Sequence, residues 1–164
     1  MTYFFKEMPS PVGVLKLVAS RTGLAAILWE NDKPNRVPLK SLLEDKNDPI
    51  LIETETQLKA YFNGKLDKFS LPLDAVGTEF QKEVWKALCT IPFGQTRSYQ
   101  QIAQQIGNPK AVRAVGAANG KNPISIVVPC HRVIGANGRL TGFAGGLSIK
   151  EYLLDIEHNK DFKR

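Results

Sequence analysis

The sequence predicts an α+β protein of two domains, a small α/β N-terminal domain at residues 1–75 and a mainly helical C-terminal domain at residues 76–164. In the first 30 residues, short apolar stretches alternate with turn residues, which is typical of an antiparallel sheet. After residue 77, capping-box patterns recur ahead of apolar residues at helical spacing. Pro72 and Gly77 mark an extended connector at 66–77, where we expect the domain boundary.

The N-terminal half contains three predicted strands, at 2–8, 12–20 and 23–30, which would form an antiparallel meander. Residues 39–46 predict a short helix. The capping-box pattern at 54–57 predicts a longer helix that reaches Phe62 and is ended by Asn63 and Gly64. No residue of this half stands out as a catalytic group.

Further capping-box patterns place helices in the C-terminal half. The first begins at Thr78 and predicts a helix that ends before Pro92, with Cys89 near its end as a small buried hydrophobe. The second begins at Ser98 and predicts a helix that stops at Gly107. The third lies at 148–151 and predicts that the final helix starts near residue 148.

After Gly107, Asn108 is expected to cap a new helix that has Pro109 at its first position and runs to Gly120. Two short helices joined by a Gly-Asn turn suggest a helix-turn-helix. A helix that reads base edges in the major groove usually carries several long polar side chains. Here the outward face of the second helix is rich in methyl groups, which predicts DNA binding with little sequence preference. That face offers Lys110, Arg113, Ala114, Ala117 and Lys121.

The net charge of +6 comes entirely from the C-terminal half. Residues 1–77 hold 10 basic and 10 acidic residues, whereas residues 78–164 hold 12 and 6. Between Glu83 and Glu151 the chain has no acidic residue but eight lysines and arginines. Such a surface is an electrostatic footprint for a polyanion.

The composition argues against several other classes of protein. No apolar run approaches membrane-spanning length, and the N-terminus lacks the apolar core of a signal peptide, so we expect a cytoplasmic protein without membrane contact. The two cysteines, Cys89 and Cys130, have no CxxC spacing and predict neither a disulfide framework nor a zinc site. No motif indicates a cofactor or a metal.

The candidate site centres on residues 124–135, where an apolar, β-branched run precedes Cys130, His131 and Arg132. We interpret the run as a buried strand that delivers Cys130 to a site. A thiol titrates near ~8.5, and higher when buried, so Cys130 needs a base. His131 is the candidate base, and a bridging water is expected because adjacent side chains diverge.

The final helix supplies a possible third group. Its apolar stripe runs through Ile149, Tyr152, Leu153 and Ile156, and Glu157 takes the next position. An inward carboxylate needs a partner, so we expect Glu157 to orient the imidazole in a nucleophile, base and orienter arrangement. The competing interpretations are a core cysteine and a solvated Glu157 at a frayed helix end.

The heptad Pro-Cys-His-Arg-Val-Ile-Gly at 129–135 resembles the active-site signature of the O6-alkylguanine-DNA alkyltransferases. The similarity covers nearly all of 78–158, including residues 93–94, 98–101, 113–119, 122–123, 145–146 and 150–151, and the N-terminal half resembles the bacterial members more loosely. This resemblance implies irreversible transfer of an alkyl group from O6 of guanine to the protein's own cysteine, once per molecule and without a cofactor. O4-alkylthymine is a second candidate substrate.

The resemblance also implies roles for particular residues. Cys130 is the implied alkyl acceptor, and His131 and Glu157 are its water-linked activating pair. Asn122 is implied to brace the active-site loop. Tyr99 is implied to serve base flipping and proton donation to the leaving base.

The implied partner is double-stranded DNA with alkylated bases, bound through its minor groove by a monomer. Arg113 is the implied finger that fills the space left by the flipped nucleotide. The other expected DNA contacts are Gln81, Gln100, Asn108, Lys110 and Ala136. The implied fold is a ribonuclease H-like N-terminal domain followed by a winged-helix-like helix-turn-helix.

Two departures from the family pattern are visible. Many members have a tyrosine and a serine before the paired glycines, where this chain has Phe143 and Ala144. The implied alkyl-base pocket of Phe143, Ala144 and Gly145 therefore lacks a side-chain hydroxyl donor to O6, and backbone N–H groups must take that role. The N-terminal half has no Cys or His, so the structural zinc site of some relatives is not expected.

Three other functions stay open at this point. A cysteine hydrolase would use the same three groups and would show burst kinetics with an ester. A transcription regulator would use the helix-turn-helix, although the methyl-rich face argues against base readout. A non-repairing binder of alkylated lesions would need no acceptor, and Cys130 argues against it.

Overall fold

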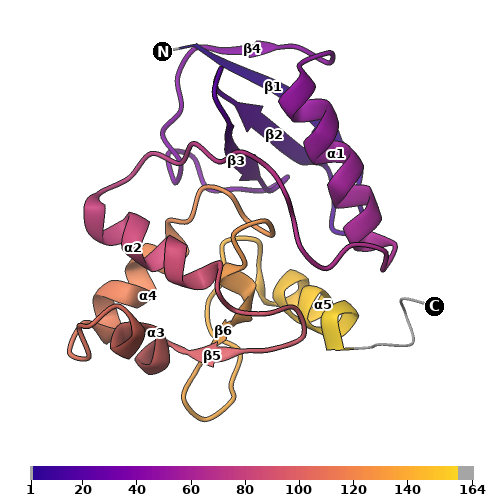
Figure 1. Ribbon diagram of the computed structural model, residues 1–164. Helices are drawn as coiled ribbons and strands as arrows, with labels where there is room; N and C mark the ends of the chain where they lie inside the picture. Colours follow the sequence, from indigo (N-terminus) through magenta and orange to yellow (C-terminus); the bar gives the residue numbers. More distant parts are fainter. Residues whose placement is uncertain (1, 159–164) are drawn as a thin grey trace.

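Three strands open the chain, and the computed structural model, which describes residues 2–158, gives them as β1 (Tyr3–Met8), β2 (Leu15–Ala19) and β3 (Leu24–Leu28). β2 pairs antiparallel with both β1 and β3, so the predicted meander is confirmed (Figure 1). β2 begins later than predicted because Ser10–Gly13 forms a turn, in which the Gly13 N–H donates to the Ser10 carbonyl at 3.1 Å.

The predicted helix at 39–46 is wrong. That segment contains β4 (Leu42–Glu44), which pairs parallel with β1 and completes a sheet of order β3-β2-β1-β4. So short a segment forms a marginal helix at best, whereas the edge of β1 offers unpaired backbone groups. Leu42 also packs on a small cluster that contains Tyr3 and Val18.

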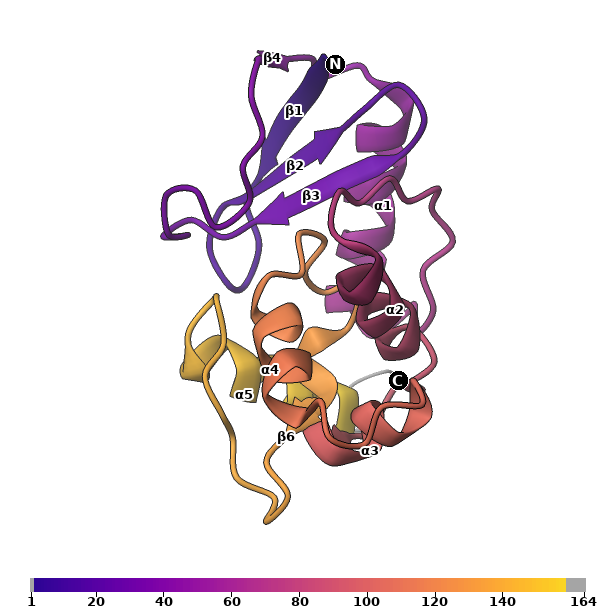
Figure 2. The ribbon, with the colours of Figure 1, turned by 90° about the vertical axis from the view of Figure 1, so that its left-hand side faces the viewer.

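α1 (Pro49–Phe62) covers one face of the sheet (Figure 2). It begins five residues before the predicted capping box, which is therefore wrong as a helix start. Asp48 is the true cap, since its Oδ2 accepts from the Leu51 N–H at 3.1 Å, and Pro49 takes the first helical position. Thr54 is buried inside the helix and its hydroxyl donates to the Ile50 carbonyl, so the capping pattern here is an interior sequence.

Two predicted helix starts in the C-terminal half are confirmed. α2 (Glu79–Leu88) and α3 (Tyr99–Gln105) each begin with a complete capping box, formed by Thr78 with Gln81 and by Ser98 with Gln101. Both caps satisfy backbone donors that would otherwise have no partner at the helix ends.

The predicted start of the next helix is wrong. α4 (Val112–Gly120) begins at Val112 rather than at Pro109, because the Asn108 carbonyl accepts from the Ala111 N–H and residues 108–111 form a turn. Its first residue is preceded by Ala111, which provides no side-chain cap. α3 and α4 pack against each other as the helix-turn-helix (Figure 1).

The remaining elements close the C-terminal half. β5 (Arg97–Ser98) pairs parallel with β6 (Val133–Ile134), which follows the 3-10 helix η1 (Cys130–Arg132). α5 (Leu147–His158) begins one residue before the predicted position. No helix within residues 2–158 is long and apolar enough to cross a lipid bilayer.

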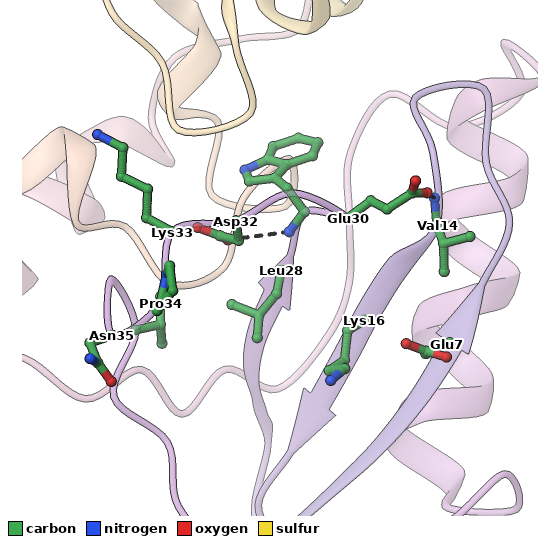
Figure 3. A pocket seen from close by; sticks show the side chains of 11 residues that line it. Glu7, Val14, Lys16, Leu28, Glu30, Asp32, Lys33, Pro34 and Asn35 are labelled. Atoms are coloured by element: carbon green, nitrogen blue, oxygen red, sulfur yellow. Dashed lines mark hydrogen bonds between the residues drawn. The ribbon is translucent and has the colours of Figure 1, made fainter.

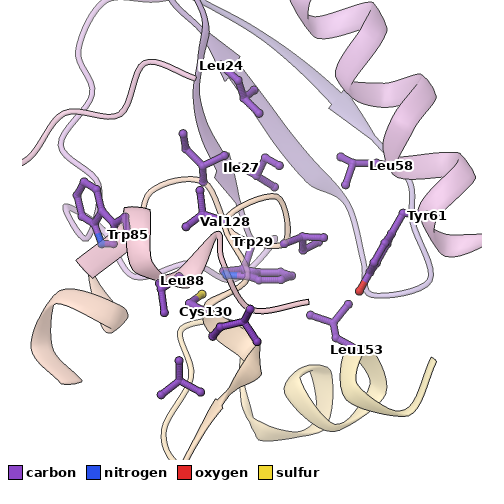
Figure 4. Packing of buried hydrophobic residues seen from close by; sticks show 14 of the residues in the cluster. Leu24, Ile27, Trp29, Leu58, Tyr61, Trp85, Leu88, Val128, Cys130 and Leu153 are labelled. Carbon is purple, nitrogen blue, oxygen red and sulfur yellow. The ribbon is translucent and has the colours of Figure 1, made fainter. Parts of the chain in front are cut away.

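One hydrophobic cluster continues from the sheet into the helical half (Figure 4). It includes Leu24 and Leu58 from the N-terminal half and Leu88, Cys130 and Leu153 from the C-terminal half. The free edge of β3 carries two isolated bridges, from Leu24 to Leu73 of the connector and from Ile27 to Ile124. β3 thus anchors the segment that leads to Cys130.

Candidate active site

The segment that leads to Cys130 is a folded-back loop, not the predicted buried strand. Ser125 bridges Val128, and Ile126 between them has a φ of 74°. Asn122 closes the loop on itself, since its Nδ2 donates to the Val128 carbonyl at 2.8 Å and its Oδ1 accepts from the Ile124 N–H at 3.0 Å. The strand interpretation failed because the run meets β3 at a single bridge, at Ile124, and then turns back on itself.

Cys130 begins η1 and is 4% exposed. Burial raises the pKa of its thiol, while Asn122, Arg36 and Lys150 oppose that rise. The resting group is therefore a neutral thiol, a weak nucleophile until a base takes its proton.

His131 and Glu157 form a fully buried pair. His131 Nε2 lies 2.7 Å from Glu157 Oε2, although the two residues come from η1 and α5. Burial lowers the pKa of His131, with the Glu157 carboxylate opposing, so the imidazole is neutral near pH 7. An ionised carboxylate only accepts hydrogen bonds, so the proton of the neutral ring lies on Nε2. Nδ1 is then the basic nitrogen, and it is buried without a hydrogen-bond partner among the described residues.

Cys130 and His131 do not share a hydrogen bond within residues 2–158. Consecutive side chains of a 3-10 helix point about 120° apart because it has ~3 residues per turn, so the divergence expected from adjacency follows from the geometry of η1. Proton transfer between them requires a mediator, and the bridging water stays a prediction.

Arg132 supplies the fixed positive charge of the site. Its Nε donates to Glu157 Oε1 at 2.8 Å, and another guanidinium nitrogen donates to Oε2 at 3.0 Å. Burial of Glu157 opposes ionisation, but His131 and Arg132 outweigh it and lower the pKa of Glu157 to about 2. The guanidinium also donates to the Ile91 carbonyl at 2.7 Å and lies over the Phe93 ring.

Tyr99 lies at the first position of α3, where its hydroxyl is hydrogen-bonded to Thr141. Thr141 Oγ1 also accepts from Lys150 Nζ at 3.3 Å, and the same ammonium donates to the Val133 carbonyl at 2.6 Å. Burial lowers the pKa of Lys150. This chain of polar groups ties the loop between β6 and α5 to the start of the helix-turn-helix.

The expected alkyl-base pocket residues pack on Trp29 of the N-terminal half. The Phe143 ring meets Trp29 edge to face, with 5.5 Å between ring centroids. A Cβ on Gly145 would come within 2.9 Å of the Trp29 ring, so only glycine fits there. Trp29 and Cys130 belong to the same hydrophobic cluster, against which Phe143 and Ala144 pack.

The predicted outward face is exposed, with Arg113, Ala114 and Ala117 on α4, Lys110 in the turn before it and Lys121 at its C-cap. Asn108 and Ala136 are also exposed. Two other expected DNA contacts already have local partners: Gln81 Oε1 accepts from the Thr78 N–H, and Gln100 Nε2 donates to the Pro109 carbonyl.

The sequence did not reveal the contributions of Tyr61 and Arg36, which lie far from the heptad. Arg36 donates to the carbonyls of Asn122 at 2.9 Å and Gly120 at 3.2 Å, and Asp32 holds its guanidinium from the other side. Tyr61 donates to Glu157 Oε2 at 2.6 Å.

Cys89, expected to be buried, is exposed at the C-cap of α2.

A hollow of about 590 Å³ lies over the sheet and contains none of the predicted site residues (Figure 3). Its wall includes Lys16 and Lys33 as well as Glu7, Glu30 and Asp32, so its charges are mixed. A second hollow of about 670 Å³ is lined by the connector, Cys89 and Arg132. Within residues 2–158, no group of three or more His, Cys, Asp or Glu side chains is placed to hold a metal ion.

Two family models match most of the chain. The model described as 6-O-methylguanine DNA methyltransferase, DNA binding domain, matches residues 79–159. The model described as 6-O-methylguanine DNA methyltransferase, ribonuclease-like domain, matches residues 3–75.

Similar proteins share nearly their full length with the chain. A methylated-DNA–protein-cysteine methyltransferase of Mycobacterium bovis is 62% identical over 159 residues, covering 95% of this chain and 93% of that protein. A protein of the same name from Methanosarcina mazei is 50% identical over 156 residues, covering 95% and 98%. A crystal structure of Mycobacterium tuberculosis OGT in complex with DNA matches with a TM-score of 0.87 at 45% identity, covering 98% of this chain and 94% of that one.

Proposed function

The chain belongs to the 6-O-methylguanine DNA methyltransferase family, and from that premise we propose that it repairs DNA by moving the alkyl group of O6-alkylguanine onto Cys130. The activity is that of a methylated-DNA–protein-cysteine methyltransferase. The observation that supports Cys130 as the acceptor is its place next to the buried His131–Glu157 pair. The other cysteine, Cys89, is exposed at the end of α2.

In the proposed reaction, Nδ1 of His131 accepts the Cys130 proton through a water, and Glu157 stabilises the resulting imidazolium. The sulfur then attacks the alkyl carbon, so that an S–C bond forms, the C–O6 bond breaks and the electron pair moves onto the purine. Tyr99 donates a proton to the leaving base and regains one from solvent, while the imidazolium of His131 returns the thiol proton to solvent, so the protons balance. The product is a thioether, which water does not cleave as it cleaves a thioester, so each molecule acts once.

The DNA-binding role falls to α4 and its surroundings. O6 of guanine is inaccessible in stacked duplex, so the nucleotide must leave the stack at a cost of a few kcal/mol, least for a mispaired lesion. Arg113, exposed on α4, would fill the vacated space. The small side chains of Ala114 and Ala117 allow α4 to approach a minor groove closely, with little sequence preference. The lysines and arginines between Glu83 and Glu151, where the chain has no acidic residue, attract the DNA phosphates.

We propose that the protein acts as a monomer. Two unpaired cysteines suit a reducing compartment, and we place the protein in the cytoplasm. Methyl transfer from O4-alkylthymine is the secondary activity to assay.

Stoichiometry is the direct test of the proposed function. With excess O6-methylguanine duplex, we expect each protein molecule to take up one methyl group and then stop. Mass spectrometry of the digested protein should place that group on the peptide that contains Cys130. Repeated turnover, or a methyl group on the Cys89 peptide, would contradict the proposal, and repeated cleavage of an ester would favour a cysteine hydrolase.

Replacing Arg113 by alanine should slow methyl transfer from duplex DNA by about 10- to 100-fold, because flipping loses a group that offsets part of the unstacking cost. Transfer from the free base O6-methylguanine needs no flipping and should change less than about twofold. Single-turnover rates on the two substrates measure the difference. Lys86→Ala, which removes an equally exposed positive charge from α2, is the matched control. Equal slowing on both substrates would reject the finger role.

A further inference from the structure

We propose that Tyr61 of α1 is a positioning residue for alkyl transfer, whose hydroxyl holds the Glu157 carboxylate so that Nδ1 of His131 remains the base. The inference rests on the proposed function, because it deepens the role of the same site. It gives the N-terminal half a part in the chemistry, since α1 and α5 are 96 residues apart along the chain at this contact.

The contact joins two fully enclosed groups. Tyr61 is 2% exposed, and its Oη lies 2.6 Å from Glu157 Oε2. Burial and the neighbouring Glu157 raise the pKa of Tyr61 well above its ordinary value, so the phenol keeps its proton and donates. A buried phenol can satisfy itself with any backbone carbonyl, yet this one faces the oxygen that binds His131.

Glu157 Oε2 receives three donors, namely the Tyr61 hydroxyl, His131 Nε2 at 2.7 Å and the Arg132 guanidinium at 3.0 Å. Such an oxygen has no room for a proton of its own, so the carboxylate stays ionised and accepts from Nε2. Each donor also draws charge from the carboxylate and lowers its basicity. The Tyr61 hydroxyl therefore weakens the hold of Glu157 on a protonated imidazole.

The surroundings fix the Tyr61 ring in place. It packs against Phe62, Phe69 and Phe93, with ring centroids 5.3, 5.4 and 6.3 Å away. The Arg132 guanidinium lies over the same Phe93 ring, 5.7 Å from its centroid. The phenol and the guanidinium therefore both reach Glu157 past the same Phe93 ring.

Few other charged or titratable groups act on Tyr61, Glu157 and His131. Arg132 faces Glu157 and His131 from η1, while Lys150 acts on His131 and Tyr152 acts on Tyr61 from α5. A Tyr61→Phe substitution leaves all of them in place and keeps the ring packing. It removes one hydrogen-bond donor from Glu157 and nothing else.

Tyr61→Phe is the test, made in the full chain with O6-methylguanine duplex as substrate. Without the Tyr61 hydroxyl, one donor fewer fixes the orientation of the Glu157 carboxylate against His131, so single-turnover methyl transfer should slow about tenfold at pH 7. Because Glu157 becomes more basic, the pKa of His131 should rise by about 0.5, and the acidic limb of the rate profile should shift to higher pH by the same amount. Nitrogen-15 NMR of the imidazole rings measures the His131 titration directly, with His158 as an internal reference.

Tyr3→Phe is the matched control, because Tyr3 is also largely buried in the N-terminal half but lies in β1, within the separate sheet cluster. It should leave the His131 titration and the transfer rate unchanged. If the His131 titration of Tyr61→Phe coincides with that of the wild type, the Tyr61 hydroxyl does not act on His131 through Glu157 and the proposal is wrong. The NMR titration does not depend on activity, so it tests Tyr61 even if the wild-type chain transfers no methyl group, which would refute the proposed function separately.

Discussion

Replacing Cys130 by alanine abolishes methyl transfer and leaves affinity for O6-methylguanine duplex within about twofold of the wild type, because the substitution removes the nucleophile but none of the exposed basic surface. The site offers no second group to take its place. His131 is neutral and bound to Glu157, and the Tyr99 hydroxyl is bound to Thr141. Transfer is measured by uptake of labelled methyl, and affinity by titration of labelled duplex.

Cys89→Ala is the matched control for this experiment. It removes the other thiol of the chain, which is exposed at the end of α2, and should leave transfer unchanged. Label on the purified Cys130→Ala protein would show that the acceptor is a different residue. Loss of DNA affinity together with transfer would show instead that the substitution disturbs the fold.

Replacing Glu157 by glutamine should lower the free energy of unfolding by roughly 3–5 kcal/mol and slow methyl transfer by at least about 100-fold. The amide places an NH₂ group among the Arg132, His131 and Tyr61 donors, and it leaves the largely buried Arg132 charge without a counter-ion. Urea denaturation and single-turnover rates measure the two effects. Glu151→Gln on the exposed side of α5 should change neither.

The same carboxylate gives stability a defined pH dependence. Its pKa is about 2 in the folded protein and ordinarily 4.5, so a depressed folded-state value adds stability above pH 4.5 that disappears as the pH falls toward 2. The contribution is roughly 3 kcal/mol at neutral pH. The free energies of unfolding of wild type and Glu157→Gln, measured by urea denaturation at each pH, should therefore converge as the pH falls from 4.5 to 2. Curves that stay parallel over that range would contradict the assignment.

Local sequence signals worked where one hydrogen-bond pattern decides the structure. The capping boxes at Thr78 and Ser98 set the starts of α2 and α3, and turn residues separated the strands of the meander. The same signals gave wrong predictions where a sequence pattern is compatible with two local structures. The capping pattern at Thr54 lies inside a helix that Asp48 starts, and residues 42–44 joined a sheet edge instead of forming a helix.

Of two predictions made for the site, one is confirmed and one is wrong. The stripe on the last helix predicts an inward Glu157, and the side chain is indeed buried. The strand expected before Cys130 is a loop held by Asn122, because apolar β-branched residues indicate burial without indicating the backbone path.

The sequence alone determined the family, the basic C-terminal surface and the grouping of a thiol with an imidazole, because these depend on residue identity and on neighbours close along the chain. Only the tertiary structure decided which donors meet at Glu157. Tyr61 reaches it from 96 residues away, and Arg36 reaches the Asn122 carbonyl across 86. Such contacts arise because β3 and α1 pack on the segment that leads to Cys130 and on α5, and no periodicity along the chain encodes that packing.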